Sequence, residues 1–175
     1  SSSVSLTIID KITSAGVVQI SPANTSPEFT DYDDGGLYFR TAPSDTFQGA
    51  VLAELAVNDG AEKPAVLALQ DAYGEGLADS FQSNFEAAGG SLALDPVIYD
   101  PKAASFEAEV GQVKASGADA IVLIGFDESA QILSGFFEAG IDPAETKIYL
   151  VDGNVGHALG EQFSEPGIRD GLQGP

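Results

Sequence analysis

Short apolar runs alternate with segments of helical periodicity along most of the chain, and this alternation restricts the fold more than any other feature. The runs, rich in β-branched or aliphatic residues, cover residues 17–20, 65–69, 93–99, 120–124 and 147–151, with residues 37–41 as a further extended candidate. Each has the length of an ordinary strand. Several are apolar at nearly every position, which predicts strands buried on both faces of a sheet.

The segments between these runs carry apolar residues three or four positions apart, as one face of a helix does. The clearest sets are Leu77, Phe81 and Phe85; Phe106, Val110 and Val113; and Ile132, Leu133, Phe136 and Phe137. Further helices are expected over about residues 4–14 and over residues 46–58. Glycines at 89–90, 117 and 140 stand where helices should end, and Asp100-Pro101 suits the start of one.

Strand, helix and strand in regular order predict right-handed crossovers and a mostly parallel sheet with helices on both faces. The fold class is therefore α/β, with three layers. Residues 1–41 supply about two strands before a new helix begins after Pro43, and two strands do not make a stable sheet of their own. Either they join the sheet that follows or they belong to a second, incomplete lobe. We favour the second lobe, because residues 171–175 also approach another strand.

Charge and composition restrict the partners. The chain of 175 residues has 27 Asp and Glu against 7 Lys and Arg, a formal net charge of −20. Such a surface repels nucleic acid and anionic membranes. The absence of cysteine excludes thiol nucleophiles, cysteine-based metal sites and disulfides. No apolar run approaches the roughly 20 residues of a membrane span, and no signal peptide opens the chain, so we expect one to be absent or already removed.

Small and polar residues follow the ends of four predicted strands. They are Ser21–Thr25, Asp71–Gly76, Gly125–Asp127 and Asp152–Asn154. In open parallel sheets, ligands bind beyond the carboxyl ends of the strands. Four such ends predict one shared cleft.

Two stretches near the start of the chain allow both a structural and a binding interpretation. Residues 19–29, QISPANTSPEF, crowd hydroxyl and amide side chains around two prolines, which suits an ordinary loop or the wall of a pocket. Ser1-Ser2-Ser3 precedes a helical stretch. These serines either cap the helix or hold an anion such as a carboxylate at its start.

Enzyme and metal motifs fail on inspection. Tyr73-Gly74-Glu75-Gly76 lacks the third glycine of a dinucleotide loop, and residues 31–42 lack the closing Glu of a calcium loop. His157 is the sole histidine, and we expect it to be solvated rather than catalytic. We therefore predict no enzyme, no cofactor and no metal. The alternative is an α/β enzyme with Asp71, Asp127 or Asp152 as acid or base.

Several of these segments, at their spacing, resemble one family. They are the serine-led helix start, residues 20–30 (ISPANTSPEFT), Phe39-Arg40-Thr41 with Gln48-Gly49, and residues 73–78 (YGEGLA). The chain resembles the type 1 periplasmic solute-binding proteins of ABC importers, specifically the leucine/isoleucine/valine-binding group. The resemblance runs along nearly the whole chain. It implies two α/β lobes that close on a solute, with residues 1–42 as the incomplete C-terminal part of lobe one and residues 43–175 as most of lobe two.

The resemblance also implies a set of ligand contacts. The carboxylate of an amino acid would meet Ser2 and Thr25, and its ammonium the carbonyl of Ala23 and the side chain of Asp152. Tyr73 would close over the ligand. Two departures bear on specificity: Phe126 stands where the family often has Tyr, and Asp152 is one methylene shorter than the Glu of the family.

The function that the resemblance implies is capture of a small polar solute, such as a branched-chain amino acid, and its delivery to a membrane permease. The location would be periplasmic or extracellular, either free or held by a lipid anchor on the full-length protein. The alternative is a ligand-sensing domain of a receptor or regulator on the same fold.

Overall fold

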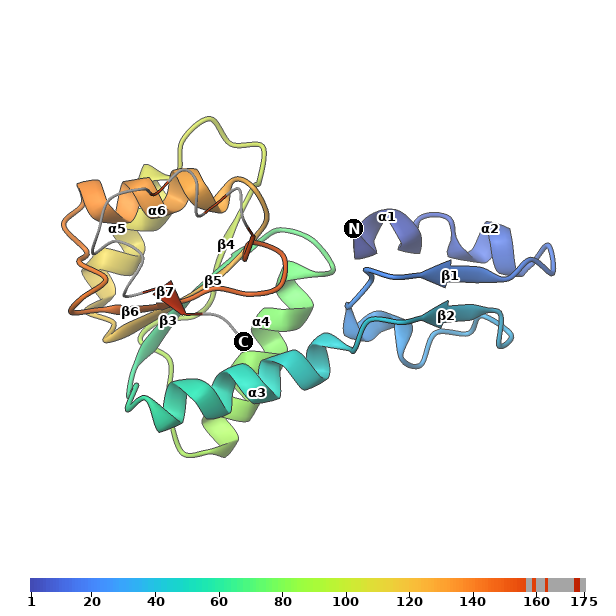
Figure 1. The fold of residues 1–175 in the computed structure, drawn as a ribbon, viewed down its shortest axis with the longest axis horizontal. Coiled ribbons are helices and arrows are strands. Elements are labelled where there is room, and N and C mark those ends of the chain that lie inside the picture. The colour runs from blue at the N-terminus through green and yellow to red at the C-terminus, as the bar shows by residue number, and fades with distance from the viewer. Residues whose placement is uncertain (157–158, 160–162, 164–171, 174–175) are drawn as a thin grey trace.

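The chain forms two separate parallel sheets with helices packed around them (Figure 1). The computed structural model describes residues 1–156, 159, 163 and 172–173. The N-terminal part contains α1 (Ser2–Leu6), α2 (Ile9–Thr13), β1 (Gln19–Ser21), the 3-10 helix η1 (Pro27–Phe29) and β2 (Tyr38–Arg40). The remainder contains α3 (Asp45–Asn58), β3 (Pro64–Leu69), α4 (Gly74–Ala87), β4 (Val97–Tyr99), α5 (Glu107–Ser116), β5 (Ala120–Ile124), α6 (Ser129–Glu138), β6 (Lys147–Tyr149) and β7 (Leu172–Gln173).

The larger sheet has five strands in the order β4-β3-β5-β6-β7, and all of its neighbours pair in parallel. Helices α3 and α4 lie on one face and α5 and α6 on the other (Figure 1). Every residue of β3 and β5 is buried, because helices cover both faces of these central strands. The three-layer α/β fold predicted from the sequence is confirmed.

The first two strands do not join this sheet. β1 and β2 pair in parallel as a two-stranded sheet of their own. Several large apolar side chains of this N-terminal part are exposed: Val4, Val17, Val18, Ile20 and Phe39. The chain passes from this small sheet to α3 through residues 41–44, where Pro43 fixes part of the backbone.

Helix ends follow the predicted glycines. Gly89, Gly117 and Gly140 all have positive φ, which only glycine adopts without strain. The predicted apolar faces are buried as well: Leu77, Phe81 and Phe85 on α4 are each 0% exposed.

Two predicted helices differ from those in the structure. Asp100 and Pro101 form a turn, in which Asp100 Oδ1 accepts the backbone N–H of Lys102, and α5 begins only at Glu107. An aspartate that bonds two residues ahead stabilises a turn as readily as a helix start. The stretch 4–14 is split into α1 and α2, and Ile8 between them has φ −120° and ψ −10°, outside the helical region.

One predicted strand is shorter than its apolar run. Within residues 93–99 only Val97–Tyr99 forms β4, since Pro96 has no N–H to donate to a ladder. Strand β6 likewise ends at Tyr149, although the chain stays buried through Val151. Of residues 171–175, Leu172–Gln173 form the edge strand β7, as the sequence suggested.

Close packing between α3 and α4 depends on Gly49. A Cβ at this position would lie 2.8 Å from the backbone nitrogen of Phe81 and closer still to Ser80 Oγ. We expect Gly49→Ala to destabilise the fold by about 1–3 kcal/mol through overpacking. Gly111→Ala on α5 is the matched control, since a Cβ there meets nothing within 4 Å. It should stabilise by about 0.5–1 kcal/mol. Denaturant unfolding measures the free energy of unfolding of both variants. If Gly49→Ala were no less stable than Gly111→Ala, the close contact between α3 and α4 at Gly49 would be contradicted.

Candidate functional site

The residues predicted at the ends of β3, β5 and β6 lie together. Tyr73 Oη donates to Asp152 Oδ1 at 2.6 Å and accepts the backbone N–H of Gly153 at 3.2 Å. The ring of Tyr73 stacks on that of Phe126, with centroids 5.1 Å apart. Three loops that follow three neighbouring strands therefore meet at one place, as the rule for parallel sheets predicts.

Each of these loops is held in place by hydrogen bonds from polar side chains. Asn154 is buried, and its amide donates to Leu123 O at 2.8 Å and Ser129 Oγ at 3.1 Å while its Oδ1 accepts from Val151 N. This fixes the turn that carries Asp152. Glu128 Oε1 accepts from Tyr99 Oη and from the N–H of Phe126, which fixes the turn after β5.

Asp71 holds the loop after β3. Its Oδ1 accepts the N–H groups of Tyr73 and Gly74 at 2.9 and 2.8 Å, and its Oδ2 accepts from Ser3 Oγ at 3.0 Å. Ser3 Oγ also accepts the N–H of Ala72. Asp71 thus satisfies donors at the start of α4 and connects the loop to α1, so both of its oxygens accept structural hydrogen bonds.

Arg40 on β2 holds the loop of residues 21–30 in place through three hydrogen bonds. Its Nη1 donates to Thr25 O at 3.0 Å and Ser26 O at 2.8 Å, and its Nη2 donates to Thr30 Oγ1 at 2.9 Å. Thr25 is buried, with 6% of its surface exposed. The guanidinium thus fixes the loop through three oxygens, in addition to the two prolines of the loop.

The remaining predicted contacts lie on the same loop or beside it. Ser2 is 2% exposed, and its Oγ accepts the N–H of Ser26 at 3.2 Å. Ser1, the N-cap of α1, makes no side-chain cap hydrogen bond. Ala23 is exposed, and its N–H donates to Ser21 Oγ at 3.2 Å. The roles of Ser2, Ala23 and Thr25 toward a ligand stay predictions.

A cavity of about 410 Å³ joins this loop to the strand ends. It is lined by Thr25, Ala42, Pro43, Phe47, Gln48, Val51, Asp152 and Val155. Three apolar side chains of this lining are exposed, Phe47, Val51 and Val155, at 67%, 39% and 53% of their area. The cavity therefore offers an apolar wall beside one hydroxyl and one carboxylate, a combination that suits a small molecule with an apolar end and a charged end.

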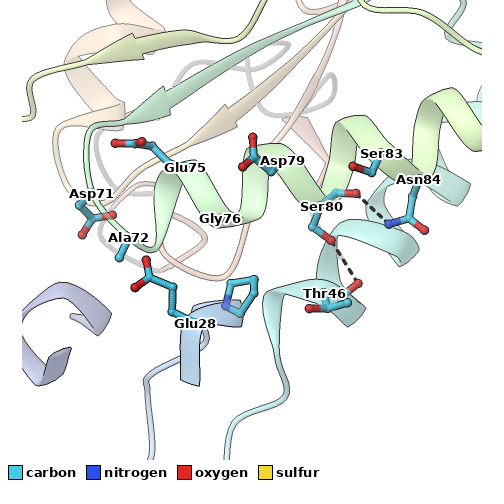
Figure 2. A pocket seen from close by; sticks show the side chains of 11 residues that line it. Glu28, Thr46, Asp71, Ala72, Glu75, Gly76, Asp79, Ser80, Ser83 and Asn84 are labelled. Carbon is cyan, nitrogen blue, oxygen red and sulfur yellow. Dashed lines mark hydrogen bonds between the residues drawn. The ribbon is translucent and has the colours of Figure 1, made fainter. Parts of the chain in front are cut away.

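A second, larger cavity of about 640 Å³ runs along α4 between η1 and the start of α3 (Figure 2). Four carboxylates, those of Glu28, Asp71, Glu75 and Asp79, belong to its lining. We call it the acidic groove. Since it has no basic side chain in its lining and lacks Thr25 and Asp152, it would repel the carboxylate of an amino acid, and the smaller cavity is the better candidate site.

Burial and charge perturb two groups at the site. The pKa of Tyr73 is raised above its ordinary value, first by burial and then by the charge of Asp152, so the phenol stays protonated and keeps donating to Asp152. Burial raises the pKa of Asp45 to about 7, and the charge of Asp152 adds to this.

The sequence analysis missed Asp45 and Gln48 as site residues. The Gln48 amide, oriented by its partners, donates to Asp152 Oδ1 at 3.0 Å and Asp45 Oδ1 at 3.1 Å, and accepts from Asp152 N at 3.0 Å. An aspartate in the first turn of a helix is usually explained by the helix dipole. The linear sequence does not show that the loop around Thr25 lies over Asp45, whose N–H donates to the carbonyl of Thr25.

Three expectations concern the histidine, membrane spans and metal ions. His157 lies outside the described residues. In the part of the chain that the structure describes, no helix combines the length and the apolar character of a bilayer span, and no three carboxylate or histidine side chains are grouped to hold a metal ion.

Comparison with known proteins places the fold and these loops in a family. The family described as periplasmic binding protein matches residues 1–167. The Leu/Ile/Val-binding protein homolog 3 of Brucella melitensis is 30% identical over 75% of this chain and 35% of that protein. A probable metabotropic glutamate receptor of Caenorhabditis elegans is 31% identical over 58% of this chain and 10% of the receptor.

A solved structure agrees with the sequence relatives. The crystal structure of a leucine-binding protein from Thermotoga maritima matches with a TM-score of 0.81 and 28% identity, over 92% of this chain and 45% of that one. The chain thus spans less than half the length of each of these proteins. With the parallel α/β architecture and the family match over residues 1–167, the chain belongs to the periplasmic binding protein family, in its type 1 leucine/isoleucine/valine-binding group.

Proposed function

We propose that the protein is the solute-binding component of an ABC importer, which captures an amino acid of the branched-chain type outside the cytoplasm and presents it to a membrane permease. The observation that carries this proposal is the 410 Å³ cavity, where Thr25 and Asp152 face the same space as an apolar wall. A zwitterion needs a donor for its carboxylate and a counter-charge for its ammonium. An aliphatic side chain needs the apolar wall.

The assignment of each contact follows the same chemistry. Thr25 and Ser2 would donate to the carboxylate, and the Ala23 carbonyl and Asp152 would accept from the ammonium. Tyr73 and Phe126 lie behind Asp152, and the protonated phenol of Tyr73 orients that carboxylate. Tyr73 Oη accepts the N–H of Gly153 and donates to Asp152 Oδ1, and Asp152 lines the cavity.

The domain boundary is part of the proposal. We assign residues 1–42 to one lobe and residues 43–175 to the other, with residues 41–44 as the connecting hinge segment. The separate two-stranded sheet supports this division, as do the exposed apolar side chains around β1 and β2, which a larger lobe would cover. Closure of two lobes over a solute is a signal that a permease can read.

A calorimetric titration of the full-length protein tests the function. L-leucine, L-isoleucine and L-valine should give saturable heats with one site, whereas 4-hydroxybenzoate, which has no ammonium, should give none. Saturable binding of 4-hydroxybenzoate without binding of any amino acid would contradict the proposal.

The similarity to a metabotropic glutamate receptor favours a second candidate, a ligand-sensing domain. Such a domain would have the same fold and would also bind an amino acid, but it would not deliver the ligand to a permease. A membrane-spanning segment in the same polypeptide, after this region, would decide for the receptor. Copurification with a permease would decide for the importer.

The close contact between the two proposed lobes at η1 depends on Gly76, near the start of α4. A Cβ at Gly76 would lie 2.8 Å from Cδ of Pro27 on η1, a rigid ring that cannot rotate away. We expect Gly76→Ala to hold the lobes apart and to weaken leucine binding about tenfold, in keeping with an overpacking penalty of about 1–3 kcal/mol. Gly111→Ala is the control, and an unchanged dissociation constant in Gly76→Ala would contradict the contact.

A further inference from the structure

The first turn of α3 contains a buried carboxyl that the proposed ligand contacts do not use. Asp45 is 0% exposed, and its Oδ2 atom has no hydrogen-bond partner among the described residues. Burial of an ionised carboxylate with an unsatisfied oxygen is strongly unfavourable. The group must therefore be neutralised, either by a proton or by a nearby positive charge.

Gln48 connects this carboxyl to the carboxylate of the candidate site. Its amide nitrogen lies between Asp45 Oδ1 and Asp152 Oδ1, at 3.1 and 3.0 Å, and its amide oxygen accepts from the N–H of Asp152. Gln48 and Asp152 both line the 410 Å³ cavity. Asp45 thus lies one side chain behind the wall of the cavity.

The charged groups that face Asp45 are mostly of the same sign. Asp152 after β6 and Asp71 after β3 are both close enough to raise the pKa of Asp45, in addition to burial. Tyr73, at the start of α4, is neutral. Arg40 on β2 lowers the pKa, as does the hydrogen bond with Thr25, but the guanidinium is bound to Thr25, Ser26 and Thr30 oxygens.

We propose that Asp45, joined to Asp152 by Gln48, holds a proton while the site is empty and releases it to solvent when the cationic nitrogen of a ligand enters. This inference rests on the proposed function, because it takes the ligand to carry an ammonium. Two close carboxylates resist ionising together. An ammonium brings one positive charge as the proton leaves, so the charge beside the two carboxylates is unchanged, while the ligand carboxylate is bound separately.

The sign of the pH dependence follows from the exchange. Only the deprotonated pair binds an ammonium well, so the apparent affinity is the intrinsic affinity multiplied by the deprotonated fraction. With the pKa of Asp45 at about 7, that fraction is about nine-tenths at pH 8 and about one-tenth at pH 6. We expect affinity to fall about tenfold between pH 8 and pH 6, and Asp45 to act as a positioning residue that makes binding sensitive to pH.

The test is calorimetry of L-leucine binding to the full-length protein at pH 6, 7 and 8, repeated in buffers of low and high ionisation enthalpy. If leucine gives no heat, L-glutamate is the second probe. Wild type should release about half a proton per ligand at pH 7 and bind about tenfold more weakly at pH 6 than at pH 8. Asp45→Asn, which keeps the shape of the side chain, should bind with a flat profile and release none. Asp79→Asn, in the acidic groove, is the control and should behave as wild type.

Each outcome decides one point. Saturable binding by wild type that is flat from pH 6 to pH 8, without proton release, overturns the proton exchange and leaves the proposed function standing. A folded wild type that binds no amino acid at any pH overturns both. If Asp45→Asn does not fold, a carbon-13 NMR titration of Asp45 in the empty wild type replaces it. A midpoint near 7 that disappears when ligand is bound supports the proposal, and a midpoint below about 5 overturns it.

Discussion

Replacement of Asp152 by alanine should weaken amino-acid binding by about 100-fold, which corresponds to about 2.7 kcal/mol. Asp152 is exposed in this structure, and lobe closure would desolvate its pair with the ligand ammonium. Loss of one partner of such a buried pair typically costs about 2–5 kcal/mol. Nothing else at the cavity replaces it, since Asp45 is buried behind Gln48. Isothermal calorimetry with L-leucine on the full-length protein measures the effect.

Thr25→Ala and Asp79→Asn complete the comparison. Thr25→Ala removes one donor to the ligand carboxylate, and a hydrogen bond to a charged group contributes about 1.5–3 kcal/mol, so we expect at least a tenfold loss. Asp79 lies on the exposed side of α4 and lines the acidic groove, so Asp79→Asn should leave affinity unchanged. Unchanged affinity in both Asp152→Ala and Thr25→Ala would refute the assignment of the site. Loss of affinity in Asp79→Asn alone would instead indicate that the ligand binds in the acidic groove.

Phe81→Ala should lower the free energy of unfolding by about 3–5 kcal/mol, as deletion of a buried aromatic ring does. Phe81 is 0% exposed, lies on the face of α4 toward the sheet and stacks on Phe85 with centroids 5.5 Å apart. The neighbouring backbone is also tightly packed, because α3 approaches it at Gly49. The cavity left by the ring therefore has little room to collapse.

Ser83→Ala is the matched control for Phe81→Ala. It lies on the same helix, is exposed, and should change stability by no more than about 0.5 kcal/mol. Guanidinium unfolding followed by far-UV circular dichroism measures both variants. A loss below about 1 kcal/mol in Phe81→Ala would show that α4 does not depend on this face for its packing.

The fold was predictable where local pattern and tertiary environment agree. Strand β5 matches the predicted run 120–124 residue for residue, and β3 differs by one residue at its start. Both are central strands, so every side chain is buried and the sequence shows an unbroken apolar run. The edge strand β4 has no such constraint, and only three residues of the predicted seven pair.

The candidate site was predictable only in part. The positions of Tyr73, Phe126 and Asp152 after strands are enough to predict that they converge, and the structure brings them together. Asp71 was an open candidate for acid–base chemistry, and its hydrogen bonds show a structural role instead. No pattern in the sequence distinguished these carboxylates. An aspartate can cap a helix, act as a counter-charge for a ligand or be solvated, and the residue type is the same in all three cases.

The sequence by itself determined the α/β class, the central strands, the apolar helix faces and the set of strand ends where a ligand can bind. These follow from periodicity and from the preferences of glycine, proline and β-branched residues, which act over a few positions of the chain. Only the tertiary structure decided that β1 and β2 form their own sheet and that Gln48 joins Asp45 to Asp152. Burial and charge coupling depend on groups up to 107 positions apart in the sequence, as Asp45 and Asp152 are, and folding brings such groups together.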